Sequence, residues 1–271
     1  MKKLLIRSLV AIVLGPLILI LTWMGGFYFL GMIIGIVLFT LYEFYAMCKR
    51  KEASSIHWLG MSASSIICYF GYLNQWSNLW LIIVPFLIVC MLVELFRNKP
   101  NPILNVALSL MGPLYVGIPF AFLLSIRMLP ELSAGNAGAK MVMLIFACVW
   151  LCDTAAYLFG ARFGRRKLMP RVSPNKTIEG TAAGFLFAIV GAYIFQIFFL
   201  NEISLLDAVA LGGICGSFGQ ASDLVESLFK RDAGIKDSSH LIPGHGGMLD
   251  RFDSQLVVVP IAYLYITQIM L

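Results

Sequence analysis

Long apolar stretches alternate with short polar ones along the whole chain. Each apolar stretch is close to the roughly 20 residues that a helix needs to cross the hydrocarbon core of a bilayer. The stretches occupy about residues 4–23, 26–47, 57–73, 79–96, 104–126, 140–160, 179–200, 205–228 and 252–271. This pattern predicts an all-α polytopic integral membrane protein with about nine transmembrane helices.

Composition supports the same class. Of the 271 residues, 60% are hydrophobic and 13% are charged, and the mean hydropathy is +0.87. Soluble domains have about 25% charged residues, so this chain has too few polar residues to cover a soluble fold. The cysteines lie in apolar stretches without a Cys-x-x-Cys pair, and we expect small buried hydrophobes rather than disulfides or zinc ligands. They are Cys48, Cys68, Cys90, Cys148, Cys152 and Cys215.

The basic residues predict the orientation of the chain. With nine membrane-crossing helices, the N-terminus and the even-numbered loops share one side, and all but two of the 20 lysines and arginines fall there. The exceptions are Arg127 and Lys140. By the positive-inside rule the N-terminus is therefore cytoplasmic. The first apolar run follows Lys2 and Lys3 as in a signal peptide, but no small-residue cleavage site ends it, so we expect a retained helix.

Two long polar loops, 161–178 and 229–251, interrupt the C-terminal half of the chain. Loops of this length are usually functional or disordered. Both loops are rich in Gly, Pro and charged residues at defined positions, and this favours a functional role. The sequence thus predicts two regions. Residues 1–139 hold about five N-terminal transmembrane helices, and residues 140–271 form a catalytic transmembrane region with both loops on the cytoplasmic side.

Several carboxylates lie in or beside the predicted helices of the C-terminal half, where charge is costly and usually functional. They are Asp153, Asp223, Glu226, Asp250 and Asp253. Asp223 and Glu226 are three residues apart and share a helix face, as do Asp250 and Asp253 if the last helix has begun there. Two converging carboxylate pairs without His or Cys form an oxygen-only site, which suits Mg²⁺. The alternative is pairing with basic residues of the same loops, for which Arg251 is a candidate.

Two further glutamates, Glu43 and Glu94, lie within or at predicted helices of the N-terminal half. Each is within a few residues of a basic cytoplasmic loop. We expect snorkelling, or pairing with Lys49, Arg50 or Arg97, to account for both.

The first polar loop is rich in positive charge. Its segment 173–180 places Ser, Lys and Thr directly before a helix whose first turn carries Glu179, and hydroxyls, an ammonium group and free backbone N–H groups suit an anion such as phosphate. No Gly-x₄-Gly-Lys-[Ser/Thr] motif occurs, which argues against P-loop ATPase or kinase chemistry. The basic residues of this loop are Arg162, Arg165, Arg166, Lys167, Arg171 and Lys176.

The second polar loop combines positive charge with glycine. Lys230, Arg231 and Lys236 supply the charge, and the run Pro-Gly-His-Gly-Gly at 243–247 forms a tight turn in which the backbone can approach a ligand closely. His245 lies among these glycines just before Asp250, and we expect it to contact a ligand by a hydrogen bond rather than to transfer a proton.

The stretch 227–253 reads Ser-x-φ-Lys-Arg, then Lys-Asp, then His-Gly-Gly-φ-x-Asp-Arg-φ-Asp, where φ is apolar. It resembles the signature of the phosphatidate cytidylyltransferase (CDP-diacylglycerol synthase) family without departure. The segments 173–180 and Asp153-x-x-Ala-Tyr157 resemble that family's upstream segments, so the resemblance covers about the last 120 residues. It implies a multi-pass, homodimeric enzyme of the cell (inner) membrane that needs Mg²⁺ and admits a monovalent cation such as K⁺.

The expected reaction transfers CMP from CTP to phosphatidic acid, giving CDP-diacylglycerol and pyrophosphate. The nucleophile is already an anion, so no general base is needed. Two anions must approach each other and pyrophosphate must leave, and metal ions together with Lys and Arg side chains offset this negative charge. The expected metal ligands are Asp223, Asp250, Glu226 and Asp253. The expected catalytic residues are Asp223, Asp250, Lys230, Arg231 and Lys236. The expected substrate-binding residues are Ser173, Asn175, Lys176, Thr177, Glu179, Arg162, Lys167, Asp153, Asp237, His245, Gly246, Gly247 and Arg251.

Three other readings compete with this one. A transporter would use carboxylates at the membrane midplane and broken helices, whereas the charge here gathers at one face. A CDP-alcohol phosphotransferase would carry a compact run of Asp residues around Asp-Gly and Ala-Arg, which is missing from the sequence. A CTP-dependent lipid kinase is chemically closer and differs in its product, because it leaves CDP free. Nothing in the sequence indicates a nucleic-acid partner.

Overall fold

The computed structural model describes residues 2–239, 241 and 246–271, the first ten of them by their backbone only. The described chain is almost entirely helical, with one short β-hairpin, which confirms the predicted all-α membrane fold. It divides into two compact units. Unit 1 comprises Met1–Met128 and Asp232–Phe252, and unit 2 comprises Leu129–Arg231 and Asp253–Leu271. Each is described by itself.

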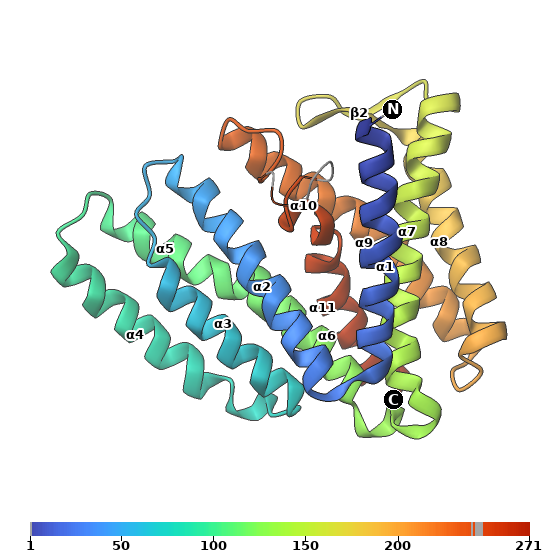
Figure 1. Ribbon diagram of the computed structural model, residues 1–271, viewed down its shortest axis with the longest axis horizontal. Helices are drawn as coiled ribbons and strands as arrows, with labels where there is room; N and C mark the ends of the chain where they lie inside the picture. Colours follow the sequence, from blue (N-terminus) through green and yellow to red (C-terminus); the bar gives the residue numbers. More distant parts are fainter. Residues whose placement is uncertain (1, 240, 242–245) are drawn as a thin grey trace. The chain divides into compact units, whose positions relative to one another are not determined.

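Unit 1 is a helical bundle built around α3, which packs against α2, α4, α5 and α6 (Figure 1). The short α10 packs on α2. The elements are α1 (Lys2–Met24), α2 (Gly26–Lys49), α3 (His57–Tyr72), the 3₁₀ turn η1 (Trp76–Asn78), α4 (Trp80–Arg97), α5 (Pro102–Gly112), the π-helical turn η2 (Pro113–Gly117), α6 (Ile118–Met128) and α10 (Leu249–Phe252).

A local irregularity in unit 1 follows directly from the sequence. Pro113 has no backbone N–H to donate to the carbonyl of Ser109 four residues earlier, so the helix widens into the π turn η2 at this point. The Ser109 carbonyl instead accepts a hydrogen bond of 2.9 Å from the hydroxyl of Tyr45 on α2. Gly60 and Gly112 lie beside that hydroxyl, where a Cβ atom on either would collide with it. The irregular turn therefore ties α2 to α5.

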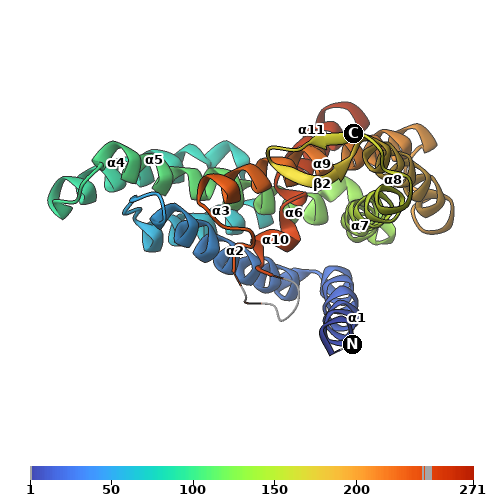
Figure 2. The same ribbon diagram turned by 90° about the horizontal axis from the view of Figure 1, so that it is seen from above.

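Unit 2 is built on α7 and α8, which lie side by side along their length in both views (Figures 1 and 2). A two-stranded antiparallel hairpin joins the end of α7 to the start of α8. The elements are the 3₁₀ turns η3 (Pro130–Leu132) and η4 (Ala134–Asn136), α7 (Ala137–Phe163), β1 (Lys167–Met169), β2 (Ser173–Thr177), α8 (Ile178–Phe199), α9 (Leu205–Asp232), α11 (Gln255–Tyr265) and the π-helical turn η5 (Ile266–Met270).

Within the described residues, six helical segments are long and apolar enough to cross a membrane. They are Gly26–Lys49, Trp76–Arg97, Pro102–Met128, Ala134–Phe163, Ile178–Phe199 and Leu249–Met270. Shorter apolar helices accompany them, so the chain is a polytopic membrane protein. The count of nine crossings, the cytoplasmic N-terminus and the division at residue 139 stay predictions. All six cysteines are buried free thiols, as predicted.

A candidate metal and phosphate site

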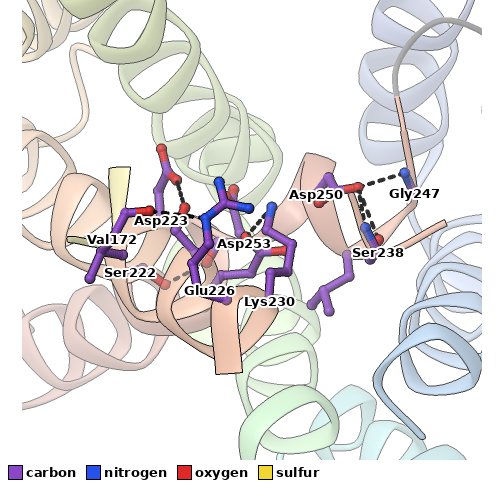
Figure 3. A network of polar contacts seen from close by, with 12 residues as sticks. Val172, Ser222, Asp223, Glu226, Lys230, Ser238, Gly247, Asp250 and Asp253 are labelled. Atoms are coloured by element: carbon purple, nitrogen blue, oxygen red, sulfur yellow. Dashed lines mark hydrogen bonds and ion pairs between the residues drawn. The ribbon is translucent and has the colours of Figure 1, made fainter. Parts of the chain in front are cut away.

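Three carboxylates gather in unit 2. One oxygen each from Asp223, Glu226 and Asp253 lies within 4.8 Å of the other two (Figure 3). Asp223 and Glu226 share a face of α9, as their spacing predicts. Asp253 comes from the segment just before α11. Three of the four predicted metal ligands are thus brought together, with oxygen donors only.

Small residues on α9 let its neighbours approach closely enough to build this cluster. A Cβ atom on Gly212 or Gly216 would collide with the backbone of α8. Further along α9, the Ser222 hydroxyl donates a hydrogen bond of 2.5 Å to the carbonyl of Asp253. The backbone N–H of Ser254 donates to Asp253 Oδ1 at 2.7 Å. Asp253 is therefore tied to α9 through its backbone carbonyl, and the N–H of the following residue orients its side chain.

Two lysines neutralise part of the negative charge in the cluster. Lys176 on β2 places Nζ 2.5 Å from Asp223 Oδ2, and Lys230, one turn beyond Glu226 on α9, places Nζ 2.5 Å from Glu226 Oε2. Both lysines were predicted to bind phosphate. Arg231, the next residue, donates from Nε to the carbonyl of Val172 at 3.3 Å, which ties the end of α9 to the hairpin. Ammonium groups thus stand where an anionic substrate would meet the carboxylates.

The hairpin that carries Lys176 is held at the start of α8. Thr177 is the N-cap of α8, and its hydroxyl accepts a hydrogen bond of 3.2 Å from the N–H of Gly180. Glu179 accepts from the backbone N–H groups of Arg165 and Arg166 at 3.0 and 3.2 Å. These contacts show a structural part for Thr177 and Glu179, and substrate contact by either stays a prediction.

Asp250 belongs to unit 1, unlike the three clustered carboxylates. Its Oδ2 accepts hydrogen bonds from the N–H and the hydroxyl of Ser238, both at 3.0 Å, and from the N–H of Gly247 at 2.8 Å. The helix expected to carry both Asp250 and Asp253 is interrupted, because α10 ends at Phe252 and α11 begins at Gln255. A shared face was predicted only if the last helix had already begun at Asp250, and the short break between α10 and α11 leaves that condition unmet. Metal binding by Asp250 stays a prediction.

Glu43 makes contacts that the sequence did not indicate. Pairing with Lys49 or Arg50 was expected, but the carboxylate of Glu43 accepts hydrogen bonds from the segment 238–249 instead. That prediction was wrong, because the side chain is directed into the unit and not toward its basic loop. The prediction for Glu94 is confirmed, since it pairs with Arg97 at 2.8 Å.

The other predicted residues divide between the two units. In unit 2, Asp153, Arg162, Lys167 and Asn175 are exposed and Ser173 is partly buried; the guanidinium of Arg162 stacks on Phe163 at 5.7 Å. In unit 1, Lys236, Asp237 and Arg251 are exposed, and Gly246 has a φ of 84° that favours glycine. His245 lies outside the described residues.

Comparisons with known proteins show the family of the chain. The model of a family described as the cytidylyltransferase family matches residues 5–269. A protein of Staphylococcus saprophyticus named phosphatidate cytidylyltransferase is 41% identical over 166 residues, which is 61% of this chain and 61% of the relative. A protein of the same name from Staphylococcus aureus strain COL is 42% identical over 167 residues, 61% of this chain and 60% of the relative. The matched segment therefore spans about three fifths of these relatives.

Proposed function

This chain belongs to the cytidylyltransferase family, and we propose from that premise that it transfers CMP from CTP to phosphatidic acid, giving CDP-diacylglycerol and pyrophosphate. The observation that carries the proposal is the group of three carboxylates flanked by two lysines in unit 2. The names of the relatives support the choice of substrates.

The donor set fits a divalent cation such as Mg²⁺. Three carboxylate oxygens within 4.8 Å of one another offer only oxygen, and Mg²⁺ binds proteins through a few carboxylates together with substrate phosphates and water. Asp223, Glu226 and Asp253 would hold it, with Asp250 as a further candidate, and Asp153 is the candidate contact for a second, monovalent cation such as K⁺. When bound, the metal would offset charge on the triphosphate and on the leaving pyrophosphate.

The chain's own residues would position two anions against each other. An oxygen of the phosphatidate phosphate attacks the α-phosphorus of CTP, and the bond from that phosphorus to the bridging oxygen of the β-phosphate breaks. Lys176 and Lys230 lie at the carboxylates and would hold phosphate oxygens, so that the two anions can approach. Phosphatidate is already ionised, so no side chain has to remove a proton. Arg231 and Lys236 follow on the same stretch of chain as further phosphate contacts.

The charges of the chain support a location for the reaction. The basic loops favour a site on the cytoplasmic side of the cell membrane, which would lie at headgroup depth so that the acyl chains of phosphatidate stay in the inner leaflet. Assembly as a homodimer is part of the proposal through the family resemblance.

The proposal is tested with purified protein in detergent, phosphatidic acid, Mg²⁺, and CTP labelled at either the α- or the γ-phosphate. Transfer of the α label into lipid with release of pyrophosphate is the expected result. Transfer of the γ label would make the protein a lipid kinase. Absence of lipid labelling from both positions, unaffected by EDTA, would refute the enzymatic proposal and favour a transporter.

A further inference from the structure

We propose that Glu43 on α2 is a positioning residue for the cytidylyl transfer, because it holds both ends of the segment 238–249 that carries Gly246 and Gly247. The inference rests on the proposed function, in which this glycine-rich segment contacts the substrate. Glu43 lies far from that segment in sequence, and no motif marks it.

The carboxylate of Glu43 is almost completely buried, with 1% of the residue exposed. Four donors of the segment surround it. At the start of the segment, the hydroxyls of Ser238 and Ser239 donate at 2.8 and 2.5 Å. At its end, the backbone N–H groups of Met248 and Leu249 donate at 2.9 and 2.8 Å. One carboxylate therefore joins the two ends of the segment to each other and to α2.

These contacts differ from those of an ordinary buried ion pair. In the described part of the chain, the hydrogen-bond partners of Glu43 are hydroxyls and backbone amides and not Lys or Arg side chains. Charge-assisted hydrogen bonds of this kind are about twice as strong as neutral ones and depend on direction. A carboxylate held by four fixed donors specifies the path of the backbone that carries them. A lysine partner would specify it less, because its flexible side chain can reach the carboxylate from several backbone conformations.

The glycine at 247 is required by the same arrangement. A Cβ atom at this position would collide with the carboxylate of Glu43 and with the hydroxyl of Ser238. The Ser238 hydroxyl also lies 3.0 Å from Asp250 Oδ2, which accepts the N–H of Gly247 as well. Glu43, Ser238 and Asp250 thus all lie against Gly247, and Glu43 links this group to α2.

The test compares Glu43→Gln with Glu94→Gln in the full-length protein. Both change a buried glutamate of unit 1 to its amide. Glu94, which is 6% exposed, pairs with Arg97 and accepts from Asn105, and neither of these partners belongs to the segment 238–249. It therefore controls for the general loss of a buried charge in this unit.

The first readout is hydrogen exchange of peptides covering 238–249, which needs no activity. Loss of a hydrogen bond to a charged group raises the equilibrium constant for local opening about tenfold or more. The exchange rate in this segment should therefore rise about tenfold in Glu43→Gln and stay unchanged in Glu94→Gln. Unchanged exchange in Glu43→Gln would overturn the holding role itself.

The second readout is the KM for CTP in the labelled-lipid assay. A partly unfolded preparation lowers the apparent kcat and leaves KM unchanged, so KM separates positioning from stability. The KM of Glu43→Gln should rise about tenfold, and that of Glu94→Gln should not. In addition, Ser239→Ala should raise KM in the wild-type background and add little to Glu43→Gln, because Glu43→Gln has already taken the charge from the hydrogen bond that Ser239 donates.

Faster hydrogen exchange in Glu43→Gln with unchanged KM and kcat would overturn the positioning role. If the wild-type protein itself transfers no CMP, the proposed function fails, and the exchange measurement still decides whether Glu43 holds the segment.

Discussion

Two groups of carboxylates in this chain differ in the kind of partner they face. In unit 2, Asp223 and Glu226 each meet the ammonium group of a lysine. In unit 1, Glu43 and Asp250 accept hydrogen bonds from backbone N–H groups and serine hydroxyls. The residue types, aspartate and glutamate, are the same in both groups.

The difference in partners separates two uses of negative charge. A lysine reaches its carboxylate through a flexible chain, and it can turn to a phosphate without any change of backbone. Backbone donors cannot move away without moving the chain that bears them. Carboxylates that face lysines are therefore suited to bind and release a ligand, and carboxylates that face backbone amides are suited to fix a loop.

Neutralising a carboxylate of the unit 2 cluster should have the largest effect. Asp223→Asn removes one of three close oxygen donors, and we expect the transfer of CMP to fall about 10²- to 10³-fold, because charge stabilisation at a reacting phosphate is typically of that size. The rate is measured with α-labelled CTP at saturating Mg²⁺.

Asp232→Asn provides a control on the same helix. Asp232 is exposed and meets Lys51 at 3.1 Å, so its loss should change the rate less than about twofold. Equal rates for Asp223→Asn and Asp232→Asn would mean that the unit 2 cluster has no more part in the transfer than an exposed surface carboxylate.

Removing a lysine should have an intermediate effect, in which the metal binds more tightly while turnover becomes slower. In Lys176→Met the ammonium no longer competes for Asp223, so the Mg²⁺ concentration for half-maximal activity should fall by up to about fivefold. Turnover should fall about tenfold or more, because a phosphate contact is lost. A Mg²⁺ titration of initial rates measures both. A higher Mg²⁺ requirement would mean that the lysine and the metal do not share this carboxylate.

Sequence patterns predicted the helices and part of the site. Asp223 and Glu226 could be paired from their spacing, because three residues on one helix fix a shared face. The break between α10 and α11 lies at a tertiary contact, because the carbonyl of Asp253 accepts a hydrogen bond from the hydroxyl of Ser222 on α9, and local spacing could not predict it. The role of Glu43 was missed for the same reason, because its donors lie about 200 residues further along the chain and no local pattern records a tertiary contact.

In unit 1, loss of a single donor should affect stability more than chemistry. Ser238→Ala removes the hydroxyl between Glu43 and Asp250 and should lower the free energy of unfolding by about 1–3 kcal/mol. Unfolding in mixed detergent micelles, followed by circular dichroism, measures this. Ser217→Ala is the matched control, because its hydroxyl is exposed and, among the residues described, donates to carbonyls of its own helix at 2.7 and 3.4 Å. If both variants unfold alike, the partly buried hydroxyl of Ser238 adds nothing to the fold.

The smallest effect is expected at Lys140 and Glu202, a lysine–carboxylate pair that is not part of a cluster. It matches Lys176 and Asp223 in length, 2.5 Å, and in exposure, with side chains 21% and 33% exposed against 25% and 30%. Glu202→Gln should leave activity unchanged and cost less than about 1 kcal/mol of stability, because such pairs are screened by water.

The pH dependence of stability in Glu202→Gln shows whether the lost ion pair causes the small loss of stability. The hydrogen bond from Lys140 holds the pKa of the Glu202 carboxyl below its ordinary value. A lowered folded-state pKa stabilises the protein above the unfolded pKa of about 4.3, and that stability is lost as the pH falls through the folded pKa. The difference in unfolding midpoint between wild type and Glu202→Gln should therefore be constant near neutral pH and vanish in acid. Loss of activity in Glu202→Gln at neutral pH would show that this isolated pair matters as much as the pair of Lys176 and Asp223. Neighbouring carboxylates would then not be the feature that makes a lysine–carboxylate pair functional in this chain.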